Sequence, residues 1–356
     1  MKKGWVILIS LLLISVIGLL MLTNSKEGDE VSGLFNRLEN GQDVRFLVIG
    51  DSIGHSTGVS NLENSWTELI SNSFENEFNV RPTIDLLTKG GSDSFDGLLE
   101  LNKFETEDNY DLVFLVYGQN DQKLIESDQF SNTYEKLVNN VIVKFPTADV
   151  VTITESHVEN ETIRNAIANI SADYGLLHID TYPPVQEVEQ SGTPLADDGV
   201  HPNDKGYEIY ANLIFDSLKK RYEEMEIYQL PSGKEVIYSE TKLNKHPQYI
   251  NGFLDKETYL VSNSKNASLE YEFKGNLVGV AVINNRDGGK FDVYIDGEKR
   301  KTIDAYSAKN VERYFLVDDQ LEYGDHTVTI IPTEENRRTS IGNIVRISGI
   351  ITSDEN

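Results

Sequence analysis

The strongest constraint on the fold is an alternation of short apolar runs with helical patterns between residues 44 and 225. The apolar runs are bounded by turn residues, as in strands that are buried on both faces. The predicted strands are 44–49, 83–87, 112–117, 150–154 and, more weakly, 176–179, and the predicted helices are 64–78, 95–101, 133–144, 161–174 and 205–225. Strands that alternate with helices predict parallel pairing through right-handed crossovers, and therefore a three-layer α/β sandwich with a parallel sheet.

The residue pattern changes near residue 229, where short β-rich runs separated by turn residues replace the helical patterns. The predicted runs are 235–239, 268–273, 278–283, 290–295, 313–317, 326–331 and 343–351. The pair Asp296-Gly297 is a typical hairpin turn between two such runs. We therefore predict a second domain, an antiparallel β-sandwich, over residues 229–356.

The N-terminus predicts a membrane-directed helix over residues 1–24. Lys2 and Lys3 precede the uncharged stretch Trp5–Leu22, which as a helix would span about 27 Å of a hydrocarbon core of about 30 Å. A cleaved signal peptide is the alternative, although the only cleavage pattern is a weak one at 23–25. We expect an uncleaved anchor, followed by a tether over 25–42. Both alternatives export the rest of the chain, either anchored at the outer face of the membrane or secreted.

Composition excludes several classes of function. The chain has 32 basic and 58 acidic side chains and a net charge of −26, which argues against nucleic acid and against contact of the folded part with an anionic membrane. Membrane contact is expected through the N-terminal helix only. Cysteine is absent from the sequence, which excludes disulfides, thiolate metal sites and a cysteine nucleophile. Neither metal-ligand spacing nor a phosphate-binding glycine loop occurs, so we predict neither a metal nor a cofactor.

Four short polar blocks lie far apart in the sequence. They are Gly50–Ile53, Gly90–Ser92, Gly118–Asp121 and Asp198–Pro202. The first and third blocks directly follow predicted strands, and the second lies a few residues past one. Ligands of open α/β sheets bind at the carboxyl ends of the strands, so we expect these blocks to meet at one edge of the sheet.

The blocks supply the parts of a serine acyl-transfer site. Serine is a weak nucleophile and needs a base within hydrogen-bond reach, which predicts Ser52 as nucleophile and His201 as base. Asp198 can reach Nδ1 of His201 while Nε2 faces Ser52, with Asp197 as the alternative carboxylate. Asn120 can donate an amide N–H to a developing oxyanion without adding charge.

The remaining histidines have no partner at a telling spacing in the sequence. His55 and His157 are either residues that line the acyl or leaving-group pocket or plain structural histidines. A histidine without such a partner is more often structural than part of a binding pocket.

The content and order of the blocks resemble the SGNH (GDSL-type) serine hydrolase superfamily over about residues 43 to 222. The resemblance extends through Gly58, Glu63, Asn64 and Trp66. It implies a catalytic domain over 43–228, with the backbone N–H groups of Ser52 and Gly91 and the Asn120 side chain forming the oxyanion hole. Gly91 is preferred to Gly90 because Ser94–Leu98 then falls in register.

The resemblance implies a carboxylic ester hydrolase that removes small acyl groups, with acetyl as our expectation. Residues 289–306 resemble the jelly-roll modules joined to carbohydrate esterases, so we expect an acylated polysaccharide as substrate. Candidate glycan-binding aromatics are Tyr294, Tyr306, Tyr314 and Phe315, which can equally belong to the core. The alternatives are an O-acyltransferase that uses the same site, a lipase or thioesterase, and a non-catalytic glycan-binding protein.

Overall fold

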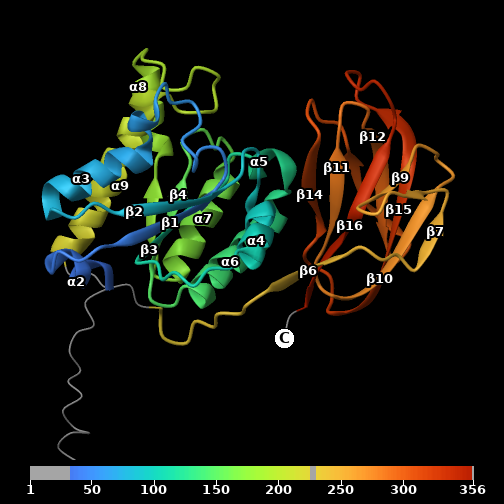
Figure 1. Ribbon diagram of the computed structural model, residues 1–356, viewed down its shortest axis with the longest axis horizontal. Helices are drawn as coiled ribbons and strands as arrows, with labels where there is room; N and C mark the ends of the chain where they lie inside the picture. The colour runs from blue at the N-terminus through green and yellow to red at the C-terminus, as the bar shows by residue number, and fades with distance from the viewer. Residues whose placement is uncertain (1–32, 225–229, 355–356) are drawn as a thin grey trace, which may run out of the picture.

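A computed structural model describes residues 33–224 and 230–354 as an α/β domain beside a β-sandwich (Figure 1). The predicted anchor or signal peptide, residues 1–24, lies outside the described residues, as does the first part of the predicted tether. Within the described ranges, no helix has both the length and the apolar character needed to cross a bilayer.

The α/β domain is built on five parallel strands in the order β2-β1-β3-β4-β5. Their bounds are β1 Arg45–Gly50, β2 Thr83–Thr88, β3 Leu112–Val116, β4 Asp149–Thr154 and β5 Leu177–Asp180. The predicted parallel sheet is confirmed, including its weakest strand. The strand order reverses between β1 and β3, and such a switch point opens a crevice at the carboxyl ends of the strands.

Helices cover both faces of this sheet (Figure 1). One face carries α2 Gly33–Glu39, α3 Trp66–Phe78, α8 Tyr182–Gln190 and α9 Asp204–Glu223, and the other carries α4 Ser94–Lys103, α6 Ser127–Lys144 and α7 Glu161–Asp173. A short helix, α5 Asp121–Leu124, follows β3. Helix α8 has no counterpart among the predicted helices, and its prolines lie in the first turn, where a missing N–H costs nothing.

Two expected boundaries differ from the structure. From Gly33 onward the predicted tether is helix α2, because Leu34, Phe35 and Leu38 bury themselves in the core under α3 and α9. The predicted strand over 235–239 is wrong, and strand β6 begins at Glu240. Ser239 is fixed instead by the α/β domain, since its N–H donates to Asn140 Oδ1 at 2.8 Å and its carbonyl accepts from Asn140 Nδ2 at 2.8 Å.

The β-sandwich consists of two antiparallel sheets, as predicted. One sheet has the order β13-β12-β15-β10-β7, and the other has the order β14-β11-β16-β9-β8 with β6 paired to β16. The bounds are β6 Glu240–Asn244, β7 Tyr249–Asn251, β8 Leu254–Asp255, β9 Leu260–Ser262, β10 Ser268–Gly275, β11 Val278–Asn284, β12 Gly289–Ile295, β13 Glu298–Asp304, β14 Val311–Asp318, β15 Gly324–Asn336 and β16 Val345–Asp354. The predicted hairpin is confirmed: Asp296 and Gly297 have φ of 51° and 84°, as the tight turn between β12 and β13 requires.

The two domains share a hydrophobic core. The sandwich contributes Leu277, Ala281, Tyr314, Leu316 and Ile351 to the cluster that also holds the buried side chains of α4 and α6. Gly279 of β11 lies so close to α4 that a Cβ there would come within 2.6 Å of the Phe95 ring. The sheet that contains β14 and β11 therefore packs directly on the α/β domain (Figure 1).

Candidate active site

The structure brings Ser52, His201 and Asp198 together at the carboxyl edge of the sheet, beside the switch point. Ser52 lies just past β1, and its Oγ is 3.0 Å from Nε2 of His201, 149 residues away in sequence. Nδ1 of His201 lies 2.6 Å from Oδ2 of Asp198. The N–H of His201 also donates to Asp198, and these hydrogen bonds hold the pKa of Asp198 well below its usual range. The carboxylate therefore stays ionised and keeps the Nε2 lone pair directed at the serine hydroxyl.

The loops that carry Ser52 and His201 are fastened to each other. Gly58 has φ of +109°, and a Cβ there would come within 2.5 Å of the Pro202 carbonyl, so only glycine allows this approach. Asp204, at the start of α9, accepts from the N–H and Oγ of Ser60 at 2.8 and 2.6 Å. Tyr207 OH donates to the Thr57 carbonyl at 2.8 Å. These contacts fix the distance between Ser52 and His201.

The alternative carboxylate, Asp197, and the two other candidate histidines have partners outside the triad. Asp197 accepts from Asn203 Nδ2 at 3.2 Å, whereas Asp198 faces His201. Nδ1 of His55 lies 3.0 Å from Thr88 Oγ1. His157 lies between Ser156 Oγ at 2.9 Å and Glu189 at 3.4 Å.

Two backbone N–H groups near the nucleophile are open donors. Among the described residues, neither the Ser52 N–H nor the Gly91 N–H donates to another protein atom. Gly91 has φ of +75°, whereas Gly90 lies outside the positive-φ region. A pair of unpaired N–H groups beside a serine is the arrangement that binds a tetrahedral oxyanion.

Asn120 lies beside these donors, but its amide is already engaged. Nδ2 donates to Asp51 Oδ2 at 2.6 Å and to the Ser92 carbonyl at 2.9 Å. The side chain thereby joins the loop after β1 to the loop after β2. Donation from Nδ2 to an oxyanion would require one of these bonds to be shared or exchanged.

A buried carboxyl pair lies beneath the site, and sequence analysis missed one of its members. Glu155 directly follows β4 and is fully buried, and one of its oxygens accepts from the Gln119 N–H at 2.6 Å. Its other oxygen, Oε1, meets no donor from the described residues, and the nearby Asp51 carboxyl helps burial to raise the pKa of Glu155. Two neighbouring buried carboxyl groups disfavour double ionisation, so a proton on Glu155 favours the pair. Glu155 therefore supports Asp51, which in turn holds the Asn120 amide.

Burial raises the pKa values of these carboxyl groups. The pKa of Asp51 rises to about 6, chiefly because of burial, and that of Glu155 rises well above its ordinary value for the same reason and because Asp51 is close. Asp121, also buried, has its pKa raised by burial to about 6. The signal that could have found Glu155 is an acid directly after a predicted strand, at the same sheet edge as Ser52 and Asn120.

We expect the protein to lose thermal stability as the pH rises from 5 to 8. The folded state keeps protons on Asp51 and Asp121 up to about pH 6, whereas the unfolded chain releases them near pH 4, so rising pH favours unfolding. The unfolding midpoint should fall by on the order of 5 °C across this range, measured by calorimetry at constant ionic strength. Glu155→Gln, which mimics the protonated carboxyl, should reduce that fall, whereas the exposed control Glu159→Gln should not. A midpoint that rises with pH would contradict the raised pKa values of Asp51 and Asp121.

A cleft of about 510 Å³ runs from the site to the β-sandwich. Gly91 and Asn120 line its inner end, and the sandwich supplies most of the remaining wall. Three of the four candidate aromatics, Tyr306, Tyr314 and Phe315, line this cleft, and Tyr294 does not. Tyr314 is largely buried, with its OH accepting from Lys103 at 2.9 Å, so it belongs to the domain interface. Tyr306 is half-buried, with the Arg337 guanidinium 5.3 Å from its ring centre.

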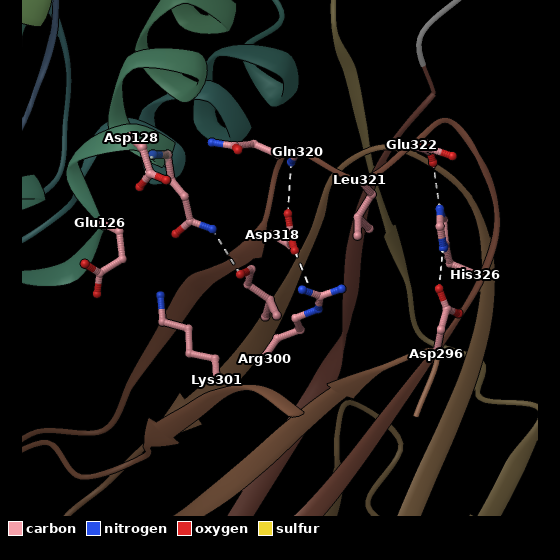
Figure 2. Close-up of a pocket in the computed structure, with 12 residues that line it drawn as sticks. Glu126, Asp128, Asp296, Arg300, Lys301, Asp318, Gln320, Leu321, Glu322 and His326 are labelled. Atoms are coloured by element: carbon pink, nitrogen blue, oxygen red, sulfur yellow. Dashed lines mark hydrogen bonds and ion pairs between the residues drawn. The ribbon is translucent and has the colours of Figure 1, made fainter. Parts of the chain in front are cut away.

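A second cavity at the domain boundary, of about 610 Å³, contains a histidine–aspartate pair that does not form a triad (Figure 2). His326 lies between Asp296, 2.7 Å from Nδ1, and the Glu322 carbonyl, 2.8 Å from Nε2 (Figure 2). Both ring nitrogens donate, which raises the pKa of His326 and leaves it no lone pair for a nucleophile. Within the described ranges, side chains able to ligate a metal do not gather in groups of three or more.

Comparisons with known proteins agree with the fold and with the sequence blocks. Residues 48–209 match the GDSL-like lipase/acylhydrolase family. The chain is similar in structure to a two-domain esterase active on acetylated mannans, with a TM-score of 0.71 and 18% identity over 93% of this chain and 97% of that one. The same esterase co-crystallised with mannopentaose gives a TM-score of 0.72 at 18% identity over 92% and 95%. At this identity the likeness shows a shared two-domain fold.

A comparison with curated protein sequences gives no match. Residues 48–209 thus form a GDSL-like lipase/acylhydrolase domain, and the chain is a carboxylic ester hydrolase.

Proposed function

We propose that the chain is an exported esterase that removes acetyl groups from a polysaccharide, with Ser52, His201 and Asp198 as its catalytic triad. The observation that carries this proposal is the continuous hydrogen-bonded line from Ser52 through His201 to Asp198. The two open N–H groups beside Ser52 support it further.

The mechanism follows from these distances. His201 takes the proton of Ser52 as Oγ attacks the ester carbonyl, and the oxyanion forms beside the N–H groups of Ser52 and Gly91. Collapse of this intermediate breaks the ester bond while His201 returns the proton to the departing sugar hydroxyl. Water, deprotonated by His201, then attacks the acetyl-serine and releases acetate.

Two observations support an acetylated glycan as substrate. The cleft beside Gly91 has both polar and apolar walls, with Tyr306 and Arg337 on the sandwich side, and flat aromatic and polar side chains suit a sugar. The structurally similar two-domain esterase is active on acetylated mannans. The N-terminal stretch of 1–24 supports export, with the site facing the outside of the cell and attached to the membrane if the stretch is uncleaved.

The proposal predicts release of free acetate from acetylated polysaccharides. The full chain and its Ser52→Ala variant would be incubated with acetylated mannan, acetylated xylan, peptidoglycan, teichoic acid and short-chain aryl esters. We expect acetate from at least one acetylated polymer with the wild-type chain, and none above background with the variant. Transfer of acetyl to an added glycan without free acetate would identify an O-acyltransferase instead. Hydrolysis confined to long-chain esters or thioesters would reject the glycan substrate.

A further inference from the structure

A cation from the β-sandwich reaches the loop that carries the open Gly91 N–H. Arg313 lies on β14, and its Nη1 donates to the Gly91 carbonyl at 2.7 Å, although the two residues are 222 positions apart in the sequence. The guanidinium also lies against the α-carbon of Gly91, since a Cβ there would come within 2.7 Å of Nη2. Gly91 is therefore covered by Arg313 on one side, and its N–H stays open.

The loop depends on such a contact because it contains two adjacent glycines. Gly90 and Gly91 have little steric restriction of their own, and Gly91 occupies the left-handed region. The next residue, Ser92, is anchored through its N–H and Oγ to the Lys89 carbonyl at 3.1 and 2.6 Å, and through its own carbonyl to Asn120. The bond from Arg313 fixes the Gly91 carbonyl, and with it the orientation of the residue.

A second cation from the sandwich touches the other loop of the site. Lys301 of β13 donates to the Leu316 carbonyl at 2.7 Å and to the Leu124 carbonyl at 3.4 Å. Leu124 ends α5, the short helix that follows Asn120. Figure 2 shows Lys301 extending from the sandwich toward Glu126 of the catalytic domain. The sandwich thus contacts the segments after both β2 and β3.

We propose that Arg313 is a positioning residue for ester hydrolysis, and that through it the β-sandwich forms part of the catalytic centre. Its guanidinium holds the Gly91 carbonyl, which restricts rotation of this glycine and so keeps its N–H directed to the oxyanion. This inference rests on the proposed function of Ser52 and Gly91. It assigns to the sandwich a role in turnover that does not require glycan binding.

The test uses 4-nitrophenyl acetate, whose acyl group reacts at Ser52 and whose leaving group is too small to bridge the cleft. In Arg313→Ala, kcat should fall by about tenfold to a hundredfold while KM changes little, because outright removal of an oxyanion donor costs about 10²-fold to 10³-fold. Arg313→Lys should keep an intermediate kcat because one ammonium can reach the carbonyl but cannot reproduce the planar fork. Millimolar guanidinium chloride should partly restore kcat in Arg313→Ala, whereas sodium chloride at the same concentration should not.

Lys103→Ala is the matched control. It removes another hydrogen bond across the domain boundary, from Lys103 Nζ to Tyr314 OH, at a distance of 2.9 Å and without touching the Gly91 loop. We expect its kcat to stay within twofold of the wild type and to be insensitive to guanidinium. Thermal unfolding of all variants shows whether a lost kcat merely follows lost stability.

The outcomes separate this inference from the proposed function. A wild-type chain as inactive as Ser52→Ala would reject the catalytic site itself. An active wild type with an unchanged kcat in Arg313→Ala would reject the role of Arg313 alone. If Arg313→Ala does not fold, the Arg313→Lys variant provides the test. A kcat equal to that of the wild type at normal stability would overturn the proposal. A decrease in kcat no larger than that of Lys103→Ala would overturn it as well.

Discussion

Ser52→Ala should reduce ester hydrolysis by on the order of 10⁴-fold to 10⁶-fold while leaving the fold intact. The substitution removes the atom that attacks the carbonyl but keeps His201 and its bond to Asp198. Ser52 is mostly buried and loses one hydrogen bond, so the free energy of unfolding should change by about 1 kcal/mol or less. Release of 4-nitrophenol and thermal unfolding measure the two effects.

Ser73→Ala is a suitable control for this loss. Ser73 lies on α3, where its Oγ donates to the Leu69 carbonyl at 3.1 Å, away from the site. Its hydrolysis rate should equal that of the wild type. Wild-type activity in Ser52→Ala would refute the triad, and a large loss in Ser73→Ala would point to a general loss of folded protein.

Truncation after Glu224 should give an unstable catalytic domain rather than an active esterase that merely lacks a glycan-binding module. The faces of α4 and α6 would lose the cover of Tyr314, Leu316 and Ile351. Each large apolar side chain that is uncovered costs about 1.5–3 kcal/mol, and a domain is stable by only about 5–15 kcal/mol in total. Soluble yield, circular dichroism and binding of a hydrophobic dye measure the outcome. A soluble truncated chain with a cooperative unfolding transition would contradict this expectation.

A point substitution probes the same interface without removing a domain. In Gly279→Ala the new Cβ would lie within 2.6 Å of the Phe95 ring, so the unfolding midpoint should fall. Gly324→Ala is the control, because a Cβ there would meet nothing closer than 3.9 Å and its φ is not positive. Equal midpoints for the two variants would mean that the interface can adapt.

The elements of the α/β domain could be predicted because their signals are local. Each strand is a short apolar run, and the blocks at residues 50, 118 and 198 sit where the alternation ends a strand or begins a helix. Parallel pairing then forces Ser52 and Asn120 to one edge. The helix at 33–39 was missed as part of the core because its apolar side chains find their partners only in the folded molecule.

The parts of the site that escaped prediction are those made by distant partners. Nothing near Arg313 in the sequence indicates that it meets Gly91, and nothing near Asn120 indicates that Asp51 and Ser92 take both of its amide hydrogens. The packing of the sandwich on α4 could not be predicted either, since nothing in the sequence indicates that Gly279 contacts Phe95. Such contacts follow from the relative placement of two domains, which local patterns do not determine.

The shared core of the two domains also determines when a newly made chain can complete its folding. The sandwich residues that cover α4 and α6 extend to Ile351, so the ribosome must have made the chain up to that residue before the surface can be closed. Domains usually fold as units in the order of their synthesis, but here the α/β domain cannot complete its core until the β-sandwich has been made. A chain that must cross a membrane before it folds would benefit from this delay, because its early portion stays open for translocation.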